Sequence, residues 1–223
     1  MIVDEGFDII VLTDMTLAND DGLTSRQRKA QETRKRVLES AIALFQEKGF
    51  DAVSVDEITQ AAGTSKGSFY TYFATKSDIV KEEFRLIDDF YESKLPEIRR
   101  FKSAKSKLVA FTRHQLEYLE SRMGYRTLAI LYMNQLSVAN DEKFLTSMER
   151  PLIRILRDII AEGQERAEIP AKRDAEELAL WAARCMRGFF LDWAISRGTI
   201  DIQTEGLEFF KGFVLGGILS NEA

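Results

Sequence analysis

The sequence predicts an all-α protein, and two observations support that prediction. Long stretches of the 223 residues place apolar side chains three and four positions apart, the spacing of one helix face, instead of alternating them as strands do. Only three prolines, Pro96, Pro151 and Pro170, interrupt the chain. Because 45% of the residues are hydrophobic, the helices have enough apolar surface to bury a sizeable core in one or two domains.

Two short helices joined by Gly63 are predicted in the segment that starts at Ser54. Ser54, with Glu57 three positions later, forms a capping box for the first helix. Gly63 supplies the turn, and either Thr64 or Ser65 caps the second helix. These signals predict the two helices of a helix-turn-helix.

The second of these helices is predicted to carry a surface that reads DNA. Phe69 and Phe73 share one face at helical spacing and point toward the core. The opposite face then presents hydroxyl, aromatic and basic side chains, which suit phosphates and base edges: Lys66, Ser68, Tyr70, Thr71 and Tyr72. This arrangement is typical of a recognition helix that enters a DNA groove.

The distribution of charge agrees with DNA binding at this end of the chain. The net charge of the whole chain is −5, but residues 24–76 contain nine Lys or Arg against six acids, so this segment is at +3 and the remainder at −8. Six of the cations fall within residues 26–36, where we expect a flexible basic arm ahead of the first helix that follows the phosphate backbone. A solvated charged segment is the alternative for these residues.

The rest of the chain is predicted to be a larger helical domain, residues 77–223. Thr75 and Asp78 start a helix that runs toward Pro96 and links the two domains. Apolar spacing predicts further helices at residues 103–122, 125–138, 141–166, 174–196 and 204–219.

The last two helices have apolar faces too broad for helices in contact with water on one side. We therefore expect them to form a homodimer interface that includes the small residues Ala179, Ala183 and Gly188 together with Phe210 and Val214. The alternative is that both helices only complete the core of the monomer.

The order of these motifs resembles the TetR family of bacterial transcription regulators. The resemblance begins at the first helix, continues through the turn and ends at the lysine that opens the fourth helix: Thr33, Val37, Ala41, Leu44, Phe45, Gly49 and Phe50, then Val55, Ile58, Ala61, Ala62, Gly63 and Ser65, then Phe69, Tyr70, Tyr72, Phe73 and Lys76. Thr59, Thr64 and Phe69 replace the alanine, valine and leucine that are common in the family. Beyond residue 76 the chain matches the family only in its helical layout.

The resemblance implies a homodimeric repressor that binds palindromic double-stranded operator DNA and is released by a small apolar effector. The residues expected to contact DNA are Thr33, Ser54, Thr64, Ser65, Lys66, Ser68, Tyr70, Tyr72 and Lys76. The effector is expected in an apolar cavity among the helices between Phe84 and Phe190. Its candidate polar contacts are His114, Gln115, Asn134 and Gln135, and a core or surface role is the alternative for each.

An enzyme is the rival hypothesis, and the sequence disfavours it. Residues 63–67 satisfy the G-x-S-x-G pattern of a nucleophile elbow, but a capped helix precedes them where an elbow requires a strand. One histidine, His114, and one cysteine, Cys185, are too few for a typical zinc site. We therefore expect no catalytic residue, metal or cofactor. An all-α ligand-binding protein or enzyme without DNA affinity is the alternative function.

The sequence also predicts where the protein acts. A single cysteine excludes an internal disulfide, and no apolar run approaches the ~18 residues of a membrane span. Residues 1–22 are acidic and lack the basic start of a secretory signal, so we do not expect export. We expect residues 1–23 to form a disordered extension. These features predict a cytoplasmic protein without membrane contact.

Overall fold

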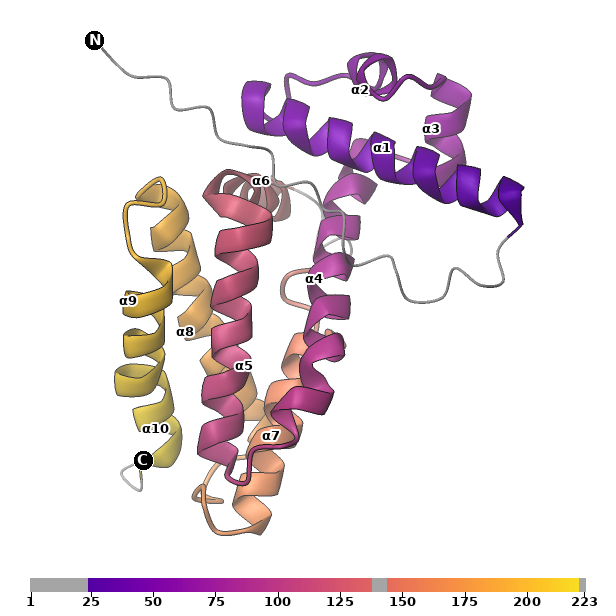
Figure 1. Cartoon of the computed structure of the whole chain (residues 1–223). Coiled ribbons are helices and arrows are strands. Elements are labelled where there is room, and N and C mark those ends of the chain that lie inside the picture. Colours follow the sequence, from indigo (N-terminus) through magenta and orange to yellow (C-terminus); the bar gives the residue numbers. More distant parts are fainter. Residues whose placement is uncertain (1–23, 138–143, 221–223) are drawn as a thin grey trace.

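The computed structural model describes residues 24–137 and 144–220, and the helices within them form two bodies (Figure 1). A head of three helices lies at one end, and the remaining helices form a longer body beneath it. No strand occurs within these residues, so the all-α prediction is confirmed. The extension predicted at residues 1–23 lies outside the described residues, as do residues 138–143.

The first helix, α1 (Ser25–Lys48), contains the whole basic segment. The hydroxyl of Thr24 accepts a hydrogen bond from the backbone N–H of Gln27, and the Gln27 side chain accepts one from the backbone N–H of Thr24. The prediction of a flexible arm ahead of the first helix is therefore wrong. Residues 26–36 contain no glycine or proline, and they continue the helix that Thr24 caps.

The next two helices, α2 (Val55–Ala61) and α3 (Lys66–Tyr72), follow the predicted caps. The reciprocal hydrogen bonds of Ser54 and Glu57 are present, which confirms the capping box. Ser65 caps α3, because its hydroxyl accepts a hydrogen bond from the backbone N–H of Ser68 at 3.1 Å. Gly63 makes the turn between the helices with φ +60°, a left-handed conformation that favours glycine.

Helix α4 (Lys76–Ile98) runs from the head into the body, as Figure 1 shows. It begins with the capping box of Thr75 and Asp78 that the sequence predicts. The helix continues two residues past Pro96 before it ends. Its length makes it a direct connection between the two bodies.

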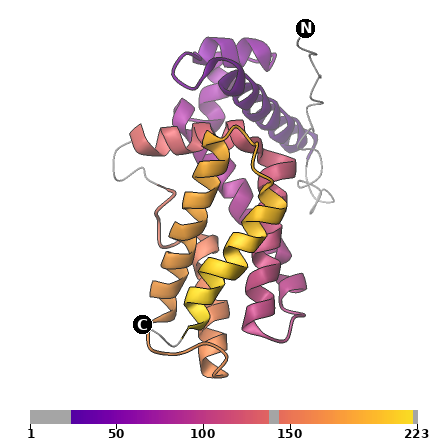
Figure 2. The same cartoon turned by 90° about the vertical axis from the view of Figure 1, so that its left-hand side faces the viewer.

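Helix α5 (Ala104–Tyr118) leads through a π-helical turn, η1 (Leu119–Met123), into α6 (Gly124–Ser137). Gly124 has φ +72° and redirects the chain at this junction. As a result, α6 lies across the end of the body and under α1; Figure 1 shows α6 end-on and Figure 2 shows it lengthwise.

Helix α7 (Pro151–Glu165) is shorter than the helix predicted at residues 141–166. The described residues 144–150 are not helical, so the predicted start is wrong. Pro151 occupies the first helical turn, where its fixed φ and missing N–H are tolerated, and this makes it a natural start. At the other end, Ala167 itself takes the left-handed conformation with φ +56°.

The C-terminal part consists of α8 (Ala175–Ile195) and a second rod made of α9 (Ile202–Phe209), the π-helical turn η3 (Phe210–Val214) and α10 (Leu215–Leu219). Figure 2 shows that this rod and α8 lie side by side on one face of the body. No helix in the described ranges is both long and apolar enough to cross a membrane.

Buried apolar side chains form two clusters, one in the head and one in the body. The head cluster centres on Val37, Phe45, Ile58 and Phe69. Ile130 from α6 belongs to the head cluster, although α6 is part of the body. The core of the head is therefore completed by a residue from the body.

Candidate DNA-binding and effector sites

The outer face of α3 is the exposed basic and aromatic surface that the sequence predicts. The side chains of Lys66 and Tyr70 are more than half exposed, whereas Phe69 and Phe73 on the other face are buried. Ser65, which caps α3, is exposed. Its hydroxyl lies 3.2 Å from the hydroxyl of Ser68, which is in the first turn of the same helix. The N-terminus of α3 thus presents hydroxyls and a cation at the positively polarised end of a helix.

Two acids in the first turn of α2, Asp56 and Glu57, bind side chains that we predict to contact DNA. The Lys66 ammonium lies 2.7 Å from the Asp56 carboxylate. The Ser54 hydroxyl is engaged with Glu57, whose carboxylate also binds Lys48 at 2.9 Å. These hydrogen bonds lower the pKa of Glu57 to about 2, so Glu57 is ionised and holds the cap at neutral pH.

Lys76, a predicted DNA contact, has its ammonium engaged within its own chain. Its ammonium donates hydrogen bonds to the backbone carbonyls of Phe50 at 2.9 Å and Val53 at 2.6 Å. The same ammonium lies 4.7 Å from the centre of the Phe50 ring. Lys76 therefore ties the loop that precedes α2 to the start of α4, and its contact with DNA stays a prediction.

Three other predicted DNA contacts, Thr33, Thr64 and Tyr72, are only partly exposed. The Thr33 hydroxyl donates to the backbone carbonyl of Lys29 in α1 at 2.8 Å, and Thr33 is half-buried. Thr64 and Tyr72 are also half-buried, and Tyr72 packs against the head cluster. Sequence reasoning missed Asp56; an acid in the first turn of the helix that precedes a recognition helix was the available signal.

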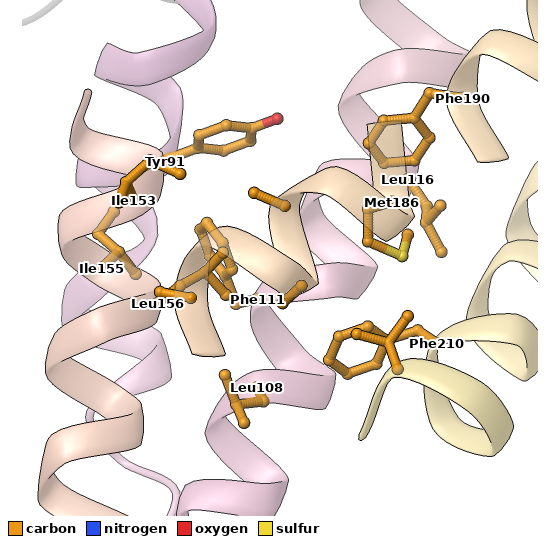
Figure 3. Packing of buried hydrophobic residues seen from close by; sticks show 14 of the residues in the cluster. Tyr91, Leu108, Phe111, Leu116, Ile153, Ile155, Leu156, Met186, Phe190 and Phe210 are labelled. Atoms are coloured by element: carbon orange, nitrogen blue, oxygen red, sulfur yellow. The ribbon is translucent and has the colours of Figure 1, made fainter. Parts of the chain in front are cut away.

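The body encloses a cavity of about 50 Å³ beneath the head. Its walls come from seven helical segments and the described residues before α7, and they are mostly aliphatic and aromatic: Phe84, Ile87, Leu119, Leu128, Leu145, Leu152, Leu156, Ala182, Ala183, Met186, Phe190 and Phe210. Figure 3 shows Tyr91, Leu156, Met186, Phe190 and Phe210 around this interior. Both π-helical turns contribute a wall residue, Leu119 from η1 and Phe210 from η3.

Five polar side chains interrupt the apolar walls: Tyr91, Gln115, Tyr132, Arg150 and Arg187. Burial raises the pKa of both tyrosines above the usual value, so both phenols stay neutral at physiological pH. The charge of Arg150 is balanced, because its guanidinium makes a bidentate ion pair with the Asp88 carboxylate at 2.9 and 3.0 Å. Sequence reasoning missed both arginines; a cation within the apolar face of α8 was the signal for Arg187.

Of the four predicted effector contacts, Gln115 alone lines the cavity. His114 points elsewhere and lies 3.4 Å from Glu97 and 3.5 Å from Glu117. Asn134 is buried near Ser77, and its amide lies 3.5 Å from the Ser77 hydroxyl.

The fourth candidate, Gln135, accepts a hydrogen bond from the backbone N–H of Leu145 at 2.8 Å. It lines a second hollow, open to the surface and about 240 Å³ in volume. Within the described residues no group of three or more His, Cys, Asp or Glu is placed to hold a metal ion. The Ser65 of the G-x-S-x-G pattern caps a helix that follows another helix, so the elbow geometry does not occur there.

Most of the residues predicted for the dimer interface are buried inside the single chain. Ala179, Ala183, Phe210 and Val214 are all less than 7% exposed, so they are unavailable to a partner and this part of the prediction is wrong. The helix that packs closely against α8 is α7 of the same chain. Gly188 is different, because a side chain added there would meet no atom within 4 Å.

The exposed apolar side chains of these helices lie elsewhere on them. Trp181 is 41% exposed, Ile195 69% and Phe213 67%. Phe213 stacks on Phe209, whose ring stacks in turn on Phe189 of α8. These residues leave exposed apolar side chains on α8 and on the C-terminal rod, the two elements that Figure 2 shows side by side.

The chain is similar to known proteins in both its sequence and its fold. Residues 37–82 match the family model described as bacterial regulatory proteins, tetR family. The chain is 25% identical over 193 residues to the HTH-type transcriptional regulator AcrR of Shigella flexneri, which covers 82% of this chain and 88% of that protein.

Two crystal structures have a similar fold. FadR of Thermus thermophilus, a TetR family transcriptional repressor in complex with lauroyl-CoA, aligns with a TM-score of 0.66 at 21% identity, over 85% of this chain and 97% of its own. FadR of Bacillus subtilis, in complex with stearoyl-CoA, aligns with a TM-score of 0.68 at 22% identity, over 84% and 98%.

Proposed function

The chain belongs to the TetR family of bacterial regulatory proteins, and we propose that it is a repressor that a small apolar effector releases from operator DNA. The observation that carries this proposal is the outer face of α3, where Lys66 and Tyr70 are exposed above a buried Phe69. We propose that this face enters the major groove of operator DNA in the cytoplasm. The chain then acts by binding and not by catalysis.

Within the proposed DNA surface the residues have different tasks. Lys66 and Ser68 contact bases or adjacent phosphates, while the caps and hydroxyls of Ser54, Thr64 and Ser65 bind phosphates. Tyr70 joins them from the exposed face of α3. Thr33 and Tyr72 are secondary candidates, because both are half-buried.

We further propose a homodimer that places two copies of α3 on a palindromic operator. The contact surface is the face of α8 and the C-terminal rod that carries Trp181, Gly188, Ile195 and Phe213. Exposed apolar side chains of this size gathered on one face are typical of a protein–protein contact. Gly188 supports the assignment because it lets a second helix approach closely without displacing any atom of its own chain.

The effector is proposed to bind in the cavity of the body. Its aliphatic and aromatic walls suit an apolar molecule. Two proteins of similar fold were crystallised with acyl-CoA molecules, so an acyl chain is the first class of effector to test.

The proposed signal passes through α4 and α6, because each helix contacts the cavity and the head at once. On α4, Phe84 lines the cavity, and Glu82 binds Arg34 of α1 at 2.6 Å. On α6, Leu128 lines the cavity, and Ile130 packs in the head cluster. An effector that moves these two helices would change the spacing of the two α3 helices in a dimer.

A DNA-binding assay tests the first half of the proposal. The full chain is titrated against the DNA upstream of its own gene and against a scrambled duplex, at several salt concentrations. Lys66→Ala should weaken specific binding and reduce the slope of log affinity against log salt by about 0.9. Lys105→Ala removes an equal charge from an exposed site at the start of α5, so it is the matched control. Equal effects of the two variants, or no DNA binding by the parent, would favour a ligand-binding protein without DNA affinity.

A release assay tests the second half. Acyl chains and other apolar molecules are titrated against the protein with and without DNA. Coupling is reciprocal, so each effector that weakens DNA binding must itself bind more weakly to the DNA complex by the same factor, typically ~5 to 150-fold. Molecules that fill the cavity and leave DNA affinity unchanged would contradict release by an effector.

A further inference from the structure

Arg187 of α8 lies where the inner cavity meets the outer hollow. Three residues, Tyr132, Leu145 and Arg187, line both spaces. The inner cavity is about 50 Å³ and the outer hollow about 240 Å³. Together they approach the ~300 Å³ at the lower end of small-molecule sites. A ligand that occupied both would pass directly beside the Arg187 guanidinium.

The charge of Arg187 has no counterion within the described residues. Arg150, the other arginine of the cavity, is paired with Asp88. The Arg187 guanidinium donates to the backbone carbonyl of Leu145 at 3.1 Å, and no carboxylate of the described residues lies within ion-pair distance. A guanidinium has five N–H donors, so several of them remain available for a ligand.

The surroundings of Arg187 increase the free energy that a bound counterion would contribute. Arg187 is half-buried, and burial lowers its pKa, with the neighbouring Arg150 and Arg184 acting in the same direction. Arginine stays charged at neutral pH in spite of such shifts. A partly desolvated cation without a carboxylate is costly, and a bound anion would offset that cost.

We infer that the effector is an amphipathic carboxylate, with its carboxylate on Arg187 and its apolar chain against the walls of the two spaces that meet there. This inference rests on the proposed function and specifies the chemistry of its ligand. The walls beyond Arg187 suit the chain, since Leu128, Leu156, Met186 and Phe190 are apolar and buried. A carboxylate suits the head group because its two oxygens match the planar fork of a guanidinium.

Direct binding measurements with matched probes test the inference. Octanoate, 1-octanol and octanoyl-CoA have the same chain length and differ in the head group. Each is titrated by calorimetry into the full chain, into Arg187→Gln and into Arg187→Lys. Arg154→Gln is the control, because Arg154 is exposed on α7 and pairs with Glu92 outside the cavity. Binding of octanol and the melting temperature show that each variant is folded.

The inference predicts that octanoate binds the parent more tightly than octanol does. In Arg187→Gln the affinity for octanoate should fall roughly ten- to hundred-fold, the value of a charge-assisted hydrogen bond, while octanol binding stays the same. Arg187→Lys should recover part of the loss, since it keeps the charge without the fork. Arg154→Gln should bind all three probes like the parent.

Other results would overturn the inference. Octanoate that binds the parent and Arg187→Gln equally, or that does not bind the parent, removes the role of Arg187. Octanoyl-CoA that binds more tightly than octanoate and loses that advantage in Arg187→Gln would assign the anion to CoA phosphates and not to a carboxylate. Octanol that releases DNA from every variant would refute the carboxylate and leave the proposed function intact, whereas DNA release by no probe would count against both.

Discussion

The ammonium of Lys66 at the start of α3 lies 2.7 Å from the carboxylate of Asp56 in α2. Both side chains are more than half exposed, so this ion pair adds little to the stability of the head. It does place a negative charge beside the cation that we expect to contact DNA. The pair therefore holds Lys66 in position and weakens its attraction for phosphate.

Asp56→Asn should bind DNA more tightly than the parent, because it removes this competing charge. We expect a gain of several-fold at low salt that shrinks as salt rises, with a salt dependence up to about 0.9 steeper if Lys66 gains a phosphate. Fluorescence anisotropy at several salt concentrations measures both quantities. Asp158→Asn is the control, since Asp158 is an exposed, paired acid on α7. An equal gain in both variants would show only an effect of net charge.

Lys76→Met should destabilise the head by about 1 to 3 kcal/mol, because the carbonyls of Phe50 and Val53 lose a charged donor. Urea unfolding measures the change. Lys66→Met is the matched control and should leave the free energy of unfolding nearly unchanged, since its ion pair is exposed. Weak DNA binding by Lys76→Met with unaltered stability would instead return Lys76 to the DNA surface.

Glu83→Gln should change how stability depends on pH. Glu83 is 4% exposed on α4, and burial together with the nearby Glu82 raises its pKa to about 7. Between pH 4.5 and about 7 the folded state therefore holds a proton that the unfolded state has lost. The stability that this group contributes is complete below pH 4.5 and is lost as pH rises through about 7.

The variant cannot ionise, so its free energy of unfolding should rise relative to the parent between pH 4.5 and 7.5, by about 3 kcal/mol at most. Denaturant unfolding at a series of pH values measures this difference. Glu82 and Tyr118, the titratable groups that interact with Glu83, are the same in both proteins. A difference that stays constant with pH would show that Glu83 has an ordinary titration.

Ala167→Gly should stabilise the body by up to about 1 kcal/mol. Ala167 follows α7 with φ +56°, a conformation that costs an L-residue roughly 1–2 kcal/mol and costs glycine little. Part of that gain is offset by the greater freedom of glycine in the unfolded chain. Ala43→Gly is the control: Ala43 is exposed within α1, so glycine there should lose about 1 kcal/mol. A loss of stability in both variants would contradict the argument.

Gly188→Arg should convert a dimer into monomers that remain folded. A Cβ at this position meets no atom of its own chain within 4 Å, so we expect the monomer to accommodate the substitution, but the arginine would place a charge in the proposed contact. Sedimentation at micromolar concentration measures the change. Gly217→Arg makes the same change at an exposed glycine of the C-terminal rod. A parent protein that is monomeric, or a Gly188→Arg dimer as stable as the parent, would move or remove the interface.

The features that the sequence predicted correctly are local ones. Both capping boxes, at Ser54 with Glu57 and at Thr75 with Asp78, depend on residues three positions apart. The burial of Phe69 follows in the same way from helical spacing. Interactions between residues far apart in the sequence could not be predicted from local patterns. An example is the ion pair of Asp88 with Arg150, which lie 62 positions apart.

The errors at the proposed dimer surface have the same origin. Periodicity shows that Ala179 lies on an apolar, small-residue face, but it does not say which helix covers that face. Here Ala179 is buried within its own chain, and the helix that packs most extensively against α8 is α7. The missed role of Arg187 is similar, because a cation on a helix acquires meaning only when Tyr132 and Leu145 are known to lie beside it.

Because Ile130 belongs to the head cluster, the head does not have a complete core of its own. One wall of its core is supplied by α6, more than fifty residues further along the chain than Lys76. A chimaera that joined residues 24–76 to the body of another regulator would leave the head cluster facing an unmatched surface. Transplanting the operator specificity of this protein therefore requires α6 to travel with the head, or a new residue that fills the place of Ile130.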